Sequence, residues 1–198
     1  MLPIGVHVPR WSDCVPLIPC AASTSKPMLL LTNKDFREFV ELLNSNGVRF
    51  LIVGGHAVAF HGYPRFTGDL DVWIATDPEN AFRVAKVLSD FGFGSLKFSA
   101  KDFVRPGYAI QLGRPPYRID ILTSIDAVAF SRAYRRRQMV RAGTLTIPFI
   151  ALEDLLKNKR ATGRPQDLAD VERLRSANKG RSGKTPRRRR APRNCGEY

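Results

Sequence analysis

The sequence predicts an α/β protein of the α+β kind, in which a small mixed sheet is flanked by helices and disordered tails lie at both ends. Helical and strand patterns alternate through the middle of the 198-residue chain, and tight turns join neighbouring strands in its second half. Such hairpins argue against a purely parallel sheet. Both chain ends lack periodic apolar residues. We therefore expect a flexible leader over 1–29, one domain over 30–175 and a basic disordered tail over 176–198.

The first part of the domain is expected to contain two helices around a strand. A helix is predicted over 33–46, where apolar residues share one face and Thr32 and Asp35 resemble a capping box. A buried strand follows over 49–53, and two glycines then lead into a short helix over 56–61.

The middle of the domain is expected to contain three strands. The first covers 70–74 and is followed by a helix from Asp77 to about Asp90, with proline at its first position. Residues 91–106 show no regular pattern. Two further strands, over 108–112 and 117–122, flank a Gly-Arg-Pro-Pro turn.

The end of the domain predicts a hairpin and two helices. The hairpin pairs 138–141 with 144–149 about an Ala-Gly turn. The helices, over 151–161 and 165–175, are joined by a Thr-Gly-Arg linker.

The charge of the chain is unusually positive. There are 32 Lys and Arg residues against 18 Asp and Glu residues, which gives a net charge of +14. Residues 175–198 contain nine of the basic residues and a single acid, so this segment supplies more than half of the charge. Polyanions such as RNA, DNA or nucleotides are the expected partners. The arginine run at 187–190 has no aromatic residues within it, so it is expected to contact phosphates without reading bases.

The cysteines and the apolar runs bear on the compartment. Cys14, Cys20 and Cys195 lie near the chain ends without a metal-binding or disulfide pattern. The apolar stretch at 16–22 is too short for an export signal, and no run reaches the roughly 18–20 residues of a membrane span. We therefore expect a reduced, cytoplasmic protein without membrane contact. Met28 precedes the first well-patterned segment and is a second candidate start.

Two glycines, Gly54 and Gly55, follow the first predicted strand and begin a helix. Free backbone N–H groups at a helix start, with no Cβ beside them, favour phosphate binding. Taken alone, the pair reads equally well as a turn that only ends the strand.

Acidic residues on the later strands favour the phosphate-binding interpretation. Thirteen residues separate Gly55 from Asp69, and Asp69 and Asp71 lie two apart, on one face of a strand. Asp120 lies inside another apolar strand, where aspartate is disfavoured without a special role. Because Mg²⁺ takes oxygen ligands from carboxylates and substrate phosphates, the three acids predict a site for two Mg²⁺ ions and a nucleoside triphosphate. Asp102 and Asp126 are weaker candidates for the third acid.

This ordered set resembles the nucleotidyltransferase superfamily, whose members have the polymerase-beta-like fold. Its pattern is Gly-Gly or Gly-Ser after a strand, two acids on the next strand and a third acid on a later one. Gly54-Gly55, Asp69, Asp71 and Asp120 match it residue by residue. Gly55 departs from the serine of many members, which removes one side-chain contact to phosphate.

A closer resemblance, over about residues 30–175, is to small bacterial nucleotidyltransferases related to abortive-infection toxins. It is carried by Gly54-Gly55-His56-Ala57, the run from Tyr63 to Asp71 and the run from Lys159 to Asp170. The resemblance implies an enzyme of the EC 2.7.7 type that moves an NMP group from ATP or another NTP to an acceptor hydroxyl. It implies an acceptor on tRNA, another RNA or a protein, within a toxin–antitoxin or phage-defence system; the residues alone leave a small-molecule acceptor open.

The site residues follow from these motifs. Asp69, Asp71 and Asp120 are expected to hold the metal ions and to be catalytic. The expected nucleotide contacts are Gly54, Gly55, Arg65, Thr67 and Lys159.

Several of these residues also fit a purely structural role. Arg65 and Thr67 also fit a solvated loop, and Lys159 also fits a helix end, where a cation is favoured. His56 and His61 are expected to be packing residues rather than catalysts. The alternative function is a nucleic-acid-binding or antitoxin-type partner protein on the same, catalytically weak fold.

Overall fold

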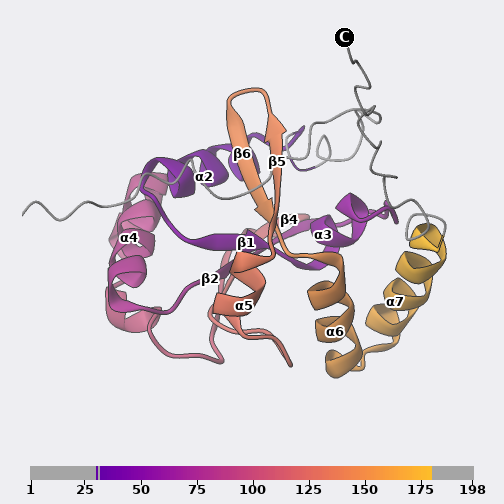
Figure 1. Cartoon of the computed structure of the whole chain (residues 1–198). Coiled ribbons are helices and arrows are strands. Elements are labelled where there is room, and N and C mark those ends of the chain that lie inside the picture. Colours follow the sequence, from indigo (N-terminus) through magenta and orange to yellow (C-terminus); the bar gives the residue numbers. More distant parts are fainter. Residues whose placement is uncertain (1–29, 31, 180–198) are drawn as a thin grey trace, which may run out of the picture.

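The computed structural model describes residue 30 and residues 32–179, and it contains a six-stranded mixed sheet flanked by helices (Figure 1). The strands are β1 (Phe50–Ile52), β2 (Asp69–Ile74), β3 (Ala109–Arg114), β4 (Tyr117–Leu122), β5 (Gln138–Ala142) and β6 (Leu145–Phe149). The helices are α2 (Lys34–Ser45), α3 (Gly54–Phe60), α4 (Pro78–Leu88), α5 (Phe130–Arg135), α6 (Leu152–Thr162) and α7 (Pro165–Asn178). Short turns of π and 3-10 helix follow α4: η1 (Ser89–Phe93), η2 (Gly94–Leu96) and η3 (Ala100–Asp102).

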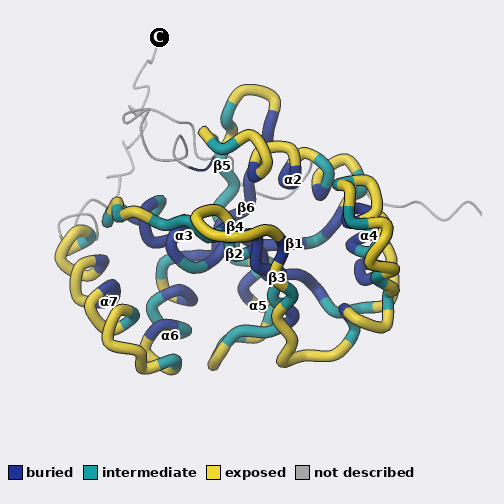
Figure 2. Tube along the Cα trace, turned by 180° about the vertical axis from the view of Figure 1, so that it is seen from behind, coloured by how far each residue is buried: buried dark blue, intermediate teal, exposed yellow. Residues whose placement is uncertain are grey.

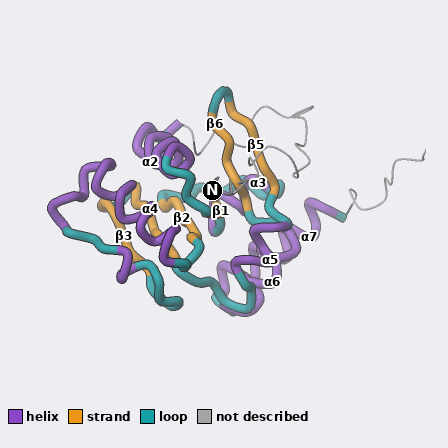
Figure 3. The backbone as a smooth tube through the Cα atoms, turned by 60° about the vertical axis from the view of Figure 1, so that its left-hand side comes forward, coloured by secondary structure: helices purple, strands orange, loops and turns teal. Residues whose placement is uncertain are grey.

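The strand order is β3-β4-β2-β1-β6-β5. The pairs β2–β4 and β1–β6 are parallel, and the other three pairs are antiparallel. Figure 3 shows the β5–β6 hairpin extending away from the rest of the sheet. The predicted fold class, a small mixed sheet flanked by helices, is therefore confirmed, and both predicted hairpins are present.

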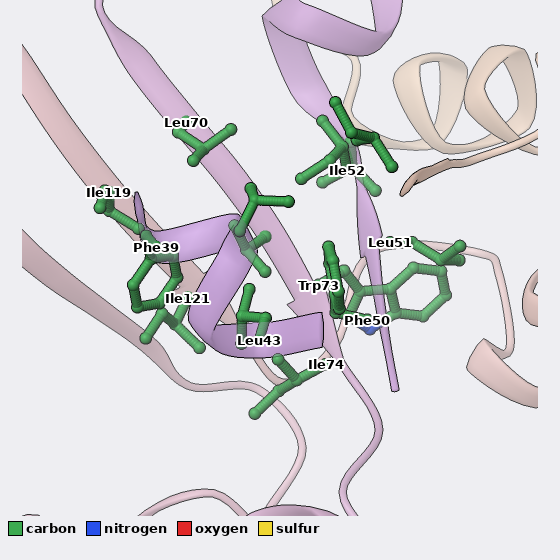
Figure 4. Close-up of a cluster of buried hydrophobic side chains, with 14 of the residues drawn as sticks. Phe39, Leu43, Phe50, Leu51, Ile52, Leu70, Trp73, Ile74, Ile119 and Ile121 are labelled. Atoms are coloured by element: carbon green, nitrogen blue, oxygen red, sulfur yellow. The ribbon is translucent and has the colours of Figure 1, made fainter. Parts of the chain in front are cut away.

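The sheet has one apolar face that holds the core. Leu70 of β2 pairs with Ile119 of β4, so both side chains lie on the same face, and both are buried. Phe39 and Leu43, buried on the apolar side of α2, belong to the same hydrophobic cluster (Figure 4). The intervening residues of β2 and β4 therefore face the other way, and that second face carries the acids.

The second face is partly covered by helices from the end of the chain. Trp73 of β2 makes an edge contact with Phe130 of α5, with ring centroids 5.1 Å apart. Helix α6 packs against α3 and α7, and Figure 2 shows exposed residues along the outer side of α7. No helix within the described residues is both long enough and apolar enough to cross a membrane.

Four local predictions differ from the structure. The cap of α2 is Asn33 rather than Thr32, because the Asn33 side chain accepts hydrogen bonds from the Asp35 and Phe36 amides. Helix α5 was not predicted, and residues 91–106 include three short helical turns. Helix α7 continues to Asn178, three residues beyond its expected end. The leader over 1–29 and almost all of the tail lie outside the described residues.

Candidate active site

Three acidic side chains share the second face of the sheet because of the strand register. In the parallel pair β2–β4, Asp71 lies opposite Asp120, and Asp69 lies opposite Arg118. Residues directly opposite in a pair point to the same side of the sheet. The structure therefore brings together the three acids that the sequence analysis proposed as metal ligands.

Arg118 links two of these acids directly. Its Nη2 lies 2.9 Å from Asp69 Oδ2, while its Nε and Nη2 donate to the two carboxylate oxygens of Asp120 at 2.7 and 3.0 Å. Such bidentate pairs between guanidinium and carboxylate are strong and fix the orientation of both groups. Hydrogen bonding to Asp120 also raises the pKa of Arg118. Arg118 therefore reduces the electrostatic repulsion between the carboxylates of Asp69 and Asp120.

Asp71 is the acid with the most perturbed ionisation. Burial and the nearby charges of Asp120 and Asp69 together raise its pKa to about 6, although a hydrogen bond from the Gly55 amide and the charge of Lys159 act in the opposite direction. A carboxylate whose charge is penalised in this way gains from a cation placed beside it.

The two glycines are required by close packing around the acids. Gly54 has φ +58°, and a Cβ there would lie 1.9 Å from Asp71 Oδ2. A Cβ on Gly55 would lie 2.6 Å from the hydroxyl oxygen of Thr67. Any larger residue at either position would displace the acid or the loop before β2. The glycine pair therefore has a structural role at the site, whether or not it also binds phosphate.

Lys159 and Arg65 meet at a buried carboxylate of α7. Lys159 Nζ lies 2.8 Å from Asp170 Oδ2 and 2.5 Å from Asp167 Oδ1. Arg65 donates from Nε and Nη2 to the two oxygens of Asp170, each at 3.1 Å. Burial opposes ionisation of Asp170, but the hydrogen bonds from Lys159 and Arg65 outweigh it and lower its pKa.

These ion pairs involve Lys159 and Arg65, two residues that the sequence predicted to contact the nucleotide. Lys159 is only 4% exposed, so its ammonium is committed to the two carboxylates of α7 as the structure stands. Arg65 is partly exposed and holds the loop before β2 against α7. The third loop residue, Thr67, donates its hydroxyl hydrogen to the Asp69 carbonyl at 3.2 Å.

Asp102, Asp126 and the two described histidines make contacts outside the acid cluster. Asp102 accepts hydrogen bonds from Ser99 and caps η3, while Asp126 bonds to residues of α6. His61 Nε2 lies 2.8 Å from the Ile150 carbonyl, in agreement with a packing role. His56 is buried beside Phe36, with ring centroids 5.8 Å apart.

The donor set fits Mg²⁺ in chemistry, because it consists of carboxylate oxygens on one sheet face. Among the described residues, however, no group of three or more His, Cys, Asp or Glu side chains is already arranged to hold a metal ion. The pairing of Arg118 with Asp69 and Asp120 gives the physical reason, since those carboxylates point to the guanidinium. Arg118 was the main residue missed from the sequence, although its position two before Asp120 places both on one face of β4.

The sequence matches the model of a known protein family. The model of a family described as nucleotidyltransferases of unknown function (DUF6036) matches residues 33–178. No curated protein matches the sequence.

Two solved structures are similar to this chain. A candidate nucleotidyltransferase from Thermotoga maritima is 18% identical over 80% of this chain and 96% of that chain, with a TM-score of 0.45. An antigenic nucleotidyltransferase-like protein from Paracoccidioides brasiliensis is 17% identical over 77% of this chain and 76% of that chain, with a TM-score of 0.43. Because the family match spans nearly all of the described residues and includes every predicted site residue, the chain belongs to this family of nucleotidyltransferases.

Proposed function

We propose that the protein is a Mg²⁺-dependent enzyme of the EC 2.7.7 type, which transfers an NMP group from a nucleoside triphosphate to an acceptor hydroxyl. The observation that carries this proposal is the register that aligns Asp71 with Asp120 and places Asp69 on the same face. In the reaction, a bond forms between the acceptor oxygen and the α-phosphorus. The bond from that phosphorus to the bridging oxygen breaks, and pyrophosphate leaves.

The three acids would hold the metal ions. When bound there, two Mg²⁺ ions would supply charge stabilisation at the attacking and leaving oxygens. Asp120 would also help to activate the acceptor hydroxyl by accepting its proton. Gly54 lets Asp71 pack directly against the glycine turn, whose backbone N–H groups would hold the triphosphate, and Arg65 and Thr67 would support the loop that borders it.

Arg118 would act as a counter-cation in the metal-free enzyme. It offsets part of the negative charge of Asp69 and Asp120 while no metal is bound, and it has to release at least one of them for a metal to bind. Its side chain, partly exposed, is then free to contact the triphosphate. Lys159 would act through the network at Asp170 rather than through direct nucleotide contact.

The test is label transfer from each of four α-³²P-labelled NTPs in cell extract, resolved into RNA, protein and small-molecule fractions. Asp69→Asn and Asp71→Asn are expected to lower transfer by several orders of magnitude, because each loses a metal ligand without changing shape. Asp90→Asn is the matched control, since Asp90 forms an exposed ion pair with Lys86 on another part of the chain. If either site variant keeps more than about a tenth of the wild-type rate, the metal assignment is wrong.

The same experiment addresses the alternative function. Nucleic-acid binding without NTP-dependent labelling in the wild-type protein would favour a binding or antitoxin-type partner protein. Labelled tRNA, other RNA or protein would identify the acceptor class. Growth arrest on expression, relieved by Asp71→Asn, would support a role in a toxin–antitoxin or phage-defence system.

The charge of the chain favours an RNA acceptor. Residues 180–198 contain seven basic residues and one acid. Each phosphate that such a segment neutralises releases counterions, so RNA affinity is expected to fall steeply with salt. A chain that ends at Lys179 keeps all of α7 and should retain turnover with saturating acceptor. Its plot of log affinity against log salt should be flatter than that of the full chain; equal slopes would show that this segment does not touch RNA.

A further inference from the structure

A pocket of about 410 Å³ lies between the start of α2, helix α3, the loop before β2 and the first residue of β4. Its volume is within the range of small-molecule sites. Thr67 lines this pocket and also lies against Gly55, whose Cβ position is 2.6 Å from the threonine hydroxyl. The pocket therefore borders the glycine turn at Gly55.

The lining of the pocket is aromatic. Phe36 is buried and makes edge contacts with His56 and Tyr117, with ring centroids 5.8 and 6.2 Å apart. Phe66 and Tyr117 also line it and are 76% and 50% exposed. Large aromatic side chains that are exposed to solvent beside a pocket are typical of sites where a flat ring of a ligand stacks.

His56 provides an unused polar group in the same lining. Its side chain is only 4% exposed, and within the described part of the chain its buried Nε2 has no hydrogen-bond partner. Burial and the charge of Arg65 lower the pKa of His56 to about 4, so the imidazole is neutral at pH 7 and offers one donor and one acceptor nitrogen. Buried polar atoms rarely lack a partner, and an unmade bond costs stability.

The charges of the lining disfavour a phosphate-binding role. Lys34 and Asp35 are the charged residues that the described lining contains, and their charges cancel. A ligand with an aromatic face and an edge of donors and acceptors fits both the rings and the imidazole.

We propose that this α2–α3 pocket binds a nucleobase, which stacks on Phe66 and Tyr117 and hydrogen-bonds to His56 at its edge. The proposal rests on the proposed transferase function and adds to it a subsite beside the glycine turn. The base belongs either to the donor triphosphate or to the terminal nucleotide of an RNA acceptor, and the experiment separates these two sources.

The experiment measures binding by isothermal titration calorimetry with the full chain in Mg²⁺. The probes are α,β-methylene analogues of ATP and UTP, inorganic tripolyphosphate, and a short RNA with either a normal or an abasic 3′-terminal nucleotide. The variants are Phe66→Ala and His56→Leu, with Phe82→Ala as the matched control, because Phe82 is 67% exposed on α4, away from the pocket lining.

If the donor base occupies the pocket, Phe66→Ala should weaken NTP-analogue binding about 5- to 150-fold, the range for loss of one base–aromatic stack, and leave tripolyphosphate binding unchanged. If the acceptor base occupies it, Phe66→Ala should weaken binding of the normal RNA and not of the abasic RNA. His56→Leu should reduce the difference in affinity between the ATP and UTP analogues, because leucine cannot hydrogen-bond to the edge of the base. Phe82→Ala should change none of these affinities.

Two results would overturn the proposal in distinguishable ways. Equal affinities of wild type and Phe66→Ala for every probe would exclude the nucleobase subsite and leave the transferase function standing. Failure of the wild-type protein to bind any NTP analogue or tripolyphosphate would refute the proposed function and the subsite together.

Discussion

Replacing Asp71 by asparagine should stabilise the metal-free protein at neutral pH while abolishing transfer. Asn keeps the shape of the side chain and can still accept the hydrogen bond from the Gly55 amide, but it has no charge to bury. The charge is costly because of burial and because Asp120 and Asp69 lie near, which raises the pKa of Asp71 to about 6 from 3.8.

The magnitude follows from proton linkage. Because the folded protein holds the proton more tightly than the unfolded chain, the free energy of unfolding falls as pH rises from 3.8 to about 6 and then stays lower. A difference of this size corresponds to about 3 kcal/mol, which for a domain of this length is about 6–12 °C in Tm. Asp71→Asn should therefore exceed the wild type by up to that amount at pH 8 and match it near pH 3.5.

The assay is thermal denaturation of both proteins in EDTA across this pH range. Adding saturating Mg²⁺ at pH 8 should raise the Tm of the wild type and not that of Asp71→Asn, since only the carboxylate gains from the cation. A stability difference that is the same at pH 8 and pH 3.5 would show that the buried charge of Asp71 is not its cause.

Three further variants test the surroundings of the acids. Arg118→Met should bind Mn²⁺ several-fold more tightly in calorimetry, because no guanidinium competes for the carboxylates; unchanged or weaker affinity would contradict a counter-cation role. Gly54→Ala should lower both the free energy of unfolding and the affinity for Mn²⁺, because the new methyl group would displace Asp71. Gly163→Ala is the control: Gly163 has a similar positive φ, but no atom lies within 4 Å of its Cβ position, so this variant should lose only about 1 kcal/mol in denaturant unfolding. Lys159→Met should destabilise the protein by about 3–5 kcal/mol, as loss of one partner from a buried ion pair does, while the exposed Lys157→Met should have little effect; equal effects would show that the buried network contributes nothing.

Much of the fold and of the acidic site could be predicted because the patterns behind them are local. The alternation around Asp69 and Asp71 fixes which face of β2 carries acids, and the turn residues mark both hairpins. Helix α5 was missed because it has six residues and one buried residue, Ala133, which is too short for a helical period to show. Thr32 and Asn33 are both good capping residues, and only the backbone geometry selects Asn33.

The ion pairs of the site depend on contacts that one sequence does not reveal. Arg118 and Asp120 could be placed on one face from their spacing, but the pairing of Arg118 with Asp69 needs the parallel register of β2 and β4. Similarly, Lys159 lies in a motif that predicts a nucleotide contact, and its burial against Asp170 follows from how α6 packs on α7.

The link between Arg65 and Asp170 joins residues that are 105 positions apart. A ribosome makes Arg65 and all three acids well before it makes α7, and a domain of this size folds as a unit once its elements are available. Until α7 emerges, Arg65 and Lys159 lack their shared carboxylate, and the loop before β2 lacks its ion pair to α7. The carboxylate that holds Arg65 and Lys159 beside the proposed site is therefore synthesised after all three acids, so ribosome-bound chains that stop before α7 carry every acid without this anchor.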